Sequence, residues 1–166
     1  SATWSDGTLS EAFVFSVYSY LGYGGFEEQM QAVITDEAFF THAGRNINTF
    51  NEGSESPSNV AWTSSTYAWS NMYSAIRQAN VAIANLPEAT FEDQSLKDKL
   101  MGEAHFLRAY YYHQLLRFYG GVPIIDSPYN LDDDLSIARS TFAQTVDFIV
   151  AELDKSASLL TGKDMA

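Results

Sequence analysis

The sequence predicts an all-α domain, and three observations support this prediction. Apolar residues recur at intervals of three and four in residues 69–83, 100–118 and 142–160, which is the spacing of one face of a helix. Residues that favour helix starts and helix ends flank these stretches. The chain has 166 residues, of which 46% are hydrophobic and 14% aromatic, so it can build one packed core and is not generally disordered.

The first helix is expected to begin at Thr8. Thr8-x-x-Glu11 has the form of a capping box, in which two side chains satisfy backbone N–H groups at the start of a helix. The run Gly22-Tyr23-Gly24-Gly25 should end this helix. Because that run follows a helix and not a strand, it is not a dinucleotide-binding loop. A second helix, with a weaker apolar pattern, is expected over Glu27–Phe40.

Residues 41–64 form the longest stretch without a helical pattern. This stretch is more than 20 residues long, is rich in Asn, Ser and Gly, and contains Pro57. Loops longer than about 12–15 residues are usually functional or mobile. We therefore expect a long loop here, and we expect binding residues within it.

Residues 66–119 are expected to form a helical hairpin. Its first helix covers about residues 66–86 and ends before Pro87, because proline disfavours the helical conformation of the residue that precedes it. The residues that share one face of this helix are Trp69, Tyr73, Ile76, Asn80 and Ile83. This pattern places Trp69 in the core and makes Asn80 a buried amide bonded to neighbouring backbone.

The second helix of the hairpin, from about Phe91 to Tyr119, is expected to be the central helix of the domain. Two apolar rows run along it, so neighbours must cover it on two sides. The rows are Leu100, Ala104, Leu107, Tyr111, Leu115 and Phe118, and Ala109, Tyr112, Leu116 and Tyr119. Glu103 and Arg108 interrupt this surface and need partners if they are buried. Of Tyr110–Tyr112, at least two should lie in the core, since successive helical residues turn by about 100°.

A last helix is expected within residues 139–160, after an irregular acidic stretch at residues 124–138. It begins with a second capping box, Thr141-x-x-Gln144. It resembles the first helix of another helical hairpin, and the second helix of that hairpin is expected beyond residue 166. We therefore expect its apolar stripe to pack against polypeptide beyond residue 166, and full coverage by the chain's own helices would contradict this. The stripe consists of Phe142, Ile149, Leu153 and Leu160.

Composition excludes several functional classes. The net charge is −12, from 21 acidic and nine basic residues, and no basic stripe exists to bind nucleic acid or an anionic membrane surface. Neutral or cationic ligands suit the charge better, although the acidity can also serve solubility alone. The chain has no cysteine, which excludes disulfides, thiolate metal sites and cysteine nucleophiles. Its longest apolar run is much shorter than the ~20 residues that cross a membrane.

The sequence predicts no metal site, no catalytic residue and no cofactor. His105 and His113 are separated by about 12 Å along one helix, too far to share an ion, and are expected to lie on the surface or beside tyrosines. Asp132–Asp134 lacks the alternating oxygen ligands of a calcium loop. Glu27-Glu28 and Asp36-Glu37 are adjacent carboxylates. Sequence neighbours seldom face each other across a cleft, as glycosidase carboxylates do, so these pairs give no information about catalysis.

The amino-acid sequence of the central helix closely resembles the signature of the SusD/RagB family. The matching residues are Gly102-Glu103-Ala104, Phe106-Leu107-Arg108-Ala109, Tyr110-Tyr111-Tyr112, Leu115, Arg117, Tyr119-Gly120 and Val122-Pro123. Two flanking segments are similar to the neighbouring helices of the family. They are Trp69-x3-Tyr73-x2-Ile76-x3-Asn80, and Arg139-Ser140-Thr141 continued by Ile149 and Glu152-Leu153-Asp154. The resemblance is specific over about residues 67–160.

This resemblance implies tetratricopeptide-like helical hairpins with long irregular loops. It also implies a lipoprotein on the outer face of a Gram-negative outer membrane, which binds an oligosaccharide or polysaccharide without cleaving it. The glycan would pass to a SusC-like TonB-dependent transporter. Family members are several times longer, so residues 1–166 are expected to be an N-terminal portion whose lipidated cysteine lies outside the sequence. The alternatives are a helical-repeat scaffold that binds only protein, the capture of peptide-like nutrients, and a glycan-active enzyme.

The expected ligand-binding residues lie in and beside the 41–64 loop. Aromatic side chains stack on the apolar face of a sugar ring, while amides and guanidinium groups bond its hydroxyls. The candidates are Trp62, Arg45, Asn48, Asn46, Asn51 and Tyr67, with Phe50 and Asn59 nearby. Trp62, Arg45 and Asn48 are the first choices. The alternative is a polar surface loop in which Trp62 packs into the domain.

Overall fold

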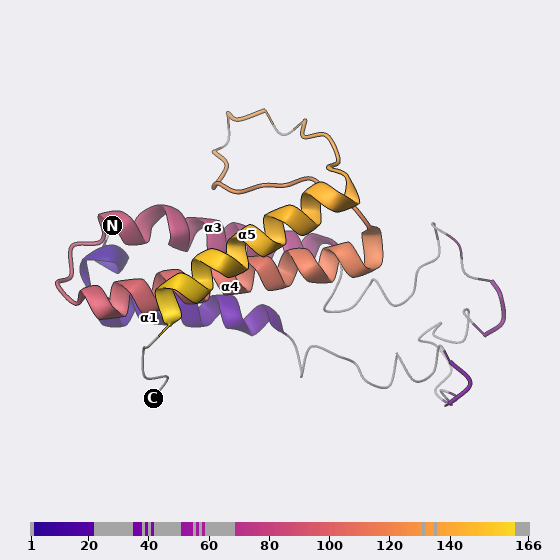
Figure 1. Cartoon of the computed structure of the whole chain (residues 1–166), viewed down its shortest axis with the longest axis horizontal. Coiled ribbons are helices and arrows are strands. Elements are labelled where there is room, and N and C mark those ends of the chain that lie inside the picture. The colour runs from indigo at the N-terminus through magenta and orange to yellow at the C-terminus, as the bar shows by residue number, and fades with distance from the viewer. Residues whose placement is uncertain are drawn as a thin grey trace.

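A computed structural model of the chain describes the parts of it that carry the helices (Figure 1). The described residues are 2–21, 35–37, 39, 41, 51–54, 56, 58, 69–130, 132–134 and 136–161. Every regular element of more than one residue within these ranges is helical, which confirms the all-α fold class for this part of the chain. The elements are η1 (Ala2–Ser5), α1 (Gly7–Tyr18), η2 (Ser19–Leu21), α3 (Trp69–Asn85), η5 (Leu86–Glu88), α4 (Gln94–Tyr119) and α5 (Phe142–Leu160).

Helix α1 begins earlier than the sequence pattern predicts. Asp6 is its N-cap, and the Asp6 side chain accepts a hydrogen bond from the Leu9 backbone N–H. Thr8 therefore lies inside the first turn, and the predicted capping box at Thr8 is wrong. The second helix predicted over Glu27–Phe40 lies mostly outside the described residues, but Thr35–Glu37 are described and form bends.

Helix α4 is the central helix and contacts α1, α3 and α5. Figure 1 shows α5 lying diagonally across the other helices, with the segment between α4 and α5 looping out at the top. Asp93 caps the start of α4, because its side chain accepts a hydrogen bond from the Leu96 N–H. The helix therefore begins at Gln94, three residues later than the predicted start at Phe91. It ends where Gly120 takes a φ of +71°, a conformation that side-chain-bearing residues rarely adopt.

The core forms around the aromatic part of α4. Tyr111 and Tyr112 are fully buried, while Tyr110 is partly buried, so two of the three consecutive tyrosines lie in the core as predicted. Trp69 differs from its prediction, because its side chain is 39% exposed. As the first residue of α3 it lies at the edge of the core, where its ring contacts those of Tyr73 and Tyr119.

Helix α5 buries a face of mixed polar and apolar residues against the domain. Its buried residues are Thr145, Ile149, Glu152 and Ser156. Phe142, Val150 and Leu153 remain 60%, 50% and 39% exposed. The predicted stripe is therefore divided: Ile149 is buried by the chain's own helices, and Phe142 and Leu153 are not.

Small residues allow α4 and α5 to approach each other closely. An ideal Cβ built on Gly102 of α4 would lie 2.7 Å from the Leu160 side chain. At the other end of α5, a Cβ on Gly121 would lie 2.2 Å from the Ser140 carbonyl oxygen. Space requires glycine at position 121, where a Cβ would meet fixed backbone, whereas at Gly102 the Leu160 side chain would have to move.

Candidate functional site

The residues predicted to bind ligand lie largely outside the described part of the structure. This holds for Trp62, Arg45, Asn48, Asn46 and Tyr67. Asn51 is described, and it lies exposed in a turn. The proposed sugar contacts in the 41–64 segment therefore stay predictions, and the described structure supplies the frame on either side of that segment.

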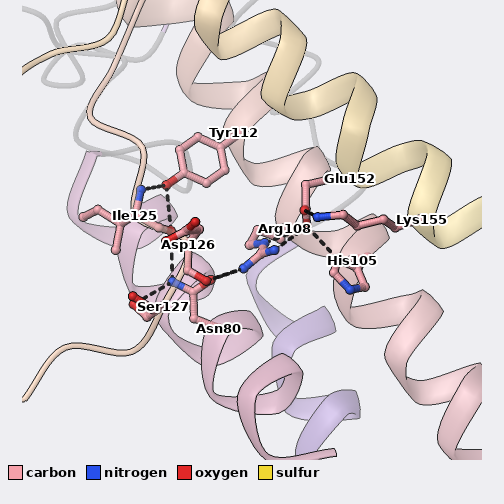
Figure 2. A network of polar contacts seen from close by, with 9 residues as sticks. All are labelled: Asn80, His105, Arg108, Tyr112, Ile125, Asp126, Ser127, Glu152 and Lys155. Carbon is pink, nitrogen blue, oxygen red and sulfur yellow. Dashed lines mark hydrogen bonds and ion pairs between the residues drawn. The ribbon is translucent and has the colours of Figure 1, made fainter. Parts of the chain in front are cut away.

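The most concentrated chemistry among the described residues is a buried polar network that joins three helices (Figure 2). Arg108 on α4 is 3% exposed, Glu152 on α5 is 0% exposed and Asn80 on α3 is 1% exposed. Such groups are stable in a core only if they are paired and hydrogen-bonded. The expectation that a buried Arg108 needs partners is confirmed by its contacts with Glu152 and Asn80.

Glu152 is the acceptor at the centre of the network. Its Oε2 lies 2.6 Å from Arg108 Nη2 and accepts a second hydrogen bond from Arg108 Nε at 2.8 Å. The same oxygen accepts from His105 Nδ1 at 2.6 Å. Its Oε1 accepts from Lys155 Nζ at 2.9 Å, and Lys155 itself reaches the surface. Both carboxylate oxygens are therefore bonded to nitrogen donors.

These contacts determine the ionisation of Glu152. Burial by itself would raise the pKa of this carboxyl, because a low-dielectric interior disfavours charge. The hydrogen bond from His105, the charge of Arg108 and the contact with Lys155 outweigh burial and lower the pKa to about 2. Glu152 is consequently an anion throughout the neutral range.

The other side of Arg108 holds the chain segment that follows α4. Arg108 Nη1 donates to Asn80 Oδ1 at 2.7 Å and to the Asp126 carbonyl at 2.8 Å. The Asn80 amide nitrogen donates in turn to the carbonyls of Ile125 and Ser127, at 3.0 and 3.2 Å. This confirms the expectation that Asn80 is a buried amide bonded to backbone, and it fixes residues 125–127 against α3.

Two tyrosines continue this attachment toward the end of α4. The Tyr112 hydroxyl accepts from the Ile125 N–H at 2.6 Å and donates to the Ile125 carbonyl at 3.1 Å. The Tyr73 hydroxyl donates to the Pro123 carbonyl at 2.7 Å. Burial raises the pKa of both tyrosines, so both remain neutral donors. An irregular segment is thus held by side chains where no helix supplies backbone partners.

Glu103, the other charged residue that interrupts the apolar surface of α4, is half-buried beside α1. Burial raises its pKa, the charge of Lys99 lowers it and Glu11 raises it. A hydrogen bond with Tyr18 also lowers the pKa of Glu103. In turn, burial and the neighbouring Glu103 carboxyl raise the pKa of Tyr18 to about 12. The expectation that Glu103 would have partners is confirmed.

Sequence reasoning missed the role of His105. It was expected at the surface or beside tyrosines, but it is 8% exposed and bonds Glu152. The signal that could have identified it is its place three positions before Arg108, on the same helix face. His113, by contrast, is exposed as expected.

The buried members of the network support structure and offer no reactive group to a ligand. Glu152 has no exposed surface and its oxygens are already bonded, so it cannot act as an acid or base on a substrate. In the described ranges no three His, Cys, Asp or Glu residues are grouped to hold a metal. Asp133 and Asp134 instead accept backbone N–H groups, from Asn130 and Ser136. The described helices include none that is long and apolar enough to cross a membrane.

Comparisons with known proteins agree on one family. The SusD-like family model, described as starch-binding and associating with the outer membrane, matches residues 7–164. The SusD-like protein P38 of Formosa agariphila is 32% identical over 94 residues, which are 56% of this chain and 18% of that protein.

Solved structures of similar fold are also SusD-like. One from Bacteroides fragilis has a TM-score of 0.79 at 28% identity and covers 95% of this chain, which spans 30% of that protein. A laminarin-binding SusD-like protein has a TM-score of 0.74 at 24% identity, covering 92% of this chain and 34% of its own. The chain thus spans no more than about a third of these relatives.

Proposed function

The chain belongs to the SusD-like family of starch-binding proteins that associate with the outer membrane, and we propose that it binds a glycan at the cell surface without cleaving it. The observation that carries this proposal is the family match over residues 7–164, which includes all four α-helices of the described structure. The laminarin-binding relative shares the fold and supports a glycan as the ligand class.

The described structure supports a binding role more than a catalytic one. Its buried charges are neutralised by one another, and its paired tyrosine hydroxyls hold backbone. Among the described helices, α3 is the next one after the polar segment 41–64, and the network fixes the inner face of α3. Binding would then come from Trp62, Arg45 and Asn48, which supply one stacking ring and hydrogen bonds suited to a neutral ligand.

Further parts of the proposal concern the complete protein. We propose that a lipidated cysteine outside residues 1–166 anchors it to the outer membrane. We also propose that it delivers its glycan to a SusC-like TonB-dependent transporter. A peptide-like nutrient is the second candidate ligand, since neither the net charge of −12 nor the residue types of the 41–64 segment exclude a neutral or basic peptide.

We propose as well that further polypeptide of the same protein covers the outer side of α5. Phe142, Val150 and Leu153 lie along this side at helical spacing and are each at least 39% exposed. Relatives are about three times longer, so they contain polypeptide that could bury such a stripe. Full burial of an exposed apolar side chain contributes about 1.5–3 kcal/mol. Because these three are already about half covered, burying the remainder would contribute about half of that for each of them.

The test is affinity electrophoresis of the complete natural polypeptide through gels that contain starch, laminarin or other polysaccharides, with each mixture assayed for new reducing ends. Retardation by a polysaccharide without new reducing ends is the expected result. New reducing ends would refute the non-catalytic role. No retardation in any gel would refute glycan capture and favour a peptide ligand or a protein-binding scaffold.

Trp62→Ala then tests the predicted binding residue. Loss of one stacking ring should weaken retention about fivefold or more. Phe15→Ala is the matched control, because Phe15 is an aromatic residue of α1 that is 64% exposed, and its removal should leave retention unchanged. Equal effects of the two substitutions would show that Trp62 is no ligand contact.

A further inference from the structure

We draw no further inference here: the strongest candidate, the exposed strip of α4 that carries Phe106 and His113, is a surface patch for which nothing in the described structure shows what covers it, apart from the further polypeptide already proposed to cover α5.

Discussion

The substitution Glu152→Gln tests the buried network most directly. It keeps the size of the side chain but removes the charge that faces Arg108, His105 and Lys155. Arg108 is 3% exposed, so its charge would remain in the core without a counter-ion. Breaking a buried ion pair in this way typically costs about 3–5 kcal/mol, and we expect a loss of this size in the free energy of unfolding.

Urea unfolding followed by far-UV circular dichroism measures this loss. Asp154→Asn is the matched control, because it makes the same chemical change on the same helix at an exposed position and should alter stability by no more than about 0.5 kcal/mol. Arg108→Met should cost much less in the Glu152→Gln background than alone, since the two residues share one interaction. A loss below about 1 kcal/mol for Glu152→Gln, similar to the control, would refute the reasoning.

The same residue predicts a dependence of stability on pH. The pKa of Glu152 is about 2 in the folded chain and 4.5 in its ordinary state. Because the folded pKa is the lower one, the stabilisation is complete above pH 4.5 and is lost as the pH falls toward 2. The full contribution is about 3 kcal/mol, of which about 2 kcal/mol should be lost by pH 3. A stability difference between wild type and Glu152→Gln that stays constant from pH 7 to pH 3 would contradict this.

Five further substitutions test the packing, two of them as comparisons. Tyr112→Phe should cost about 1–3 kcal/mol, because it removes the partner of the part-buried Ile125 N–H. The substitution Tyr110→Phe, at a partly buried tyrosine, should cost less in the same denaturant titration. Gly121→Ala should lower the melting temperature more than Gly102→Ala, because its Cβ would meet fixed backbone and not a movable leucine. Leu153→Ser should destabilise the complete polypeptide by about 1 kcal/mol or more if further chain covers α5, and equal stability would argue against that cover.

Local sequence patterns were sufficient to predict α3, α4, α5 and the family. Helical periodicity marked α3, α4 and α5, and glycine and proline marked the end of α4, because these signals act within a few residues of the chain. The sequence of residues 102–123 showed the resemblance to the family, and the family match over residues 7–164 confirms it. One error was local: Asp6, not Thr8, caps α1, because two neighbouring side chains can both serve as an N-cap.

Only the tertiary structure decided which polar residues meet. Arg108 and Glu152 are 44 positions apart, and the sequence showed that Arg108 needed a partner but not which one. His105 was misplaced for the same reason. Likewise, Asn80 and Arg77 on α3 donate to carbonyls of Ile125 and Tyr129, which lie 45 and 52 positions away. Periodicity reports which face of a helix is apolar, whereas pairing across the core depends on how α5 lies on α4, and close packing sets that arrangement.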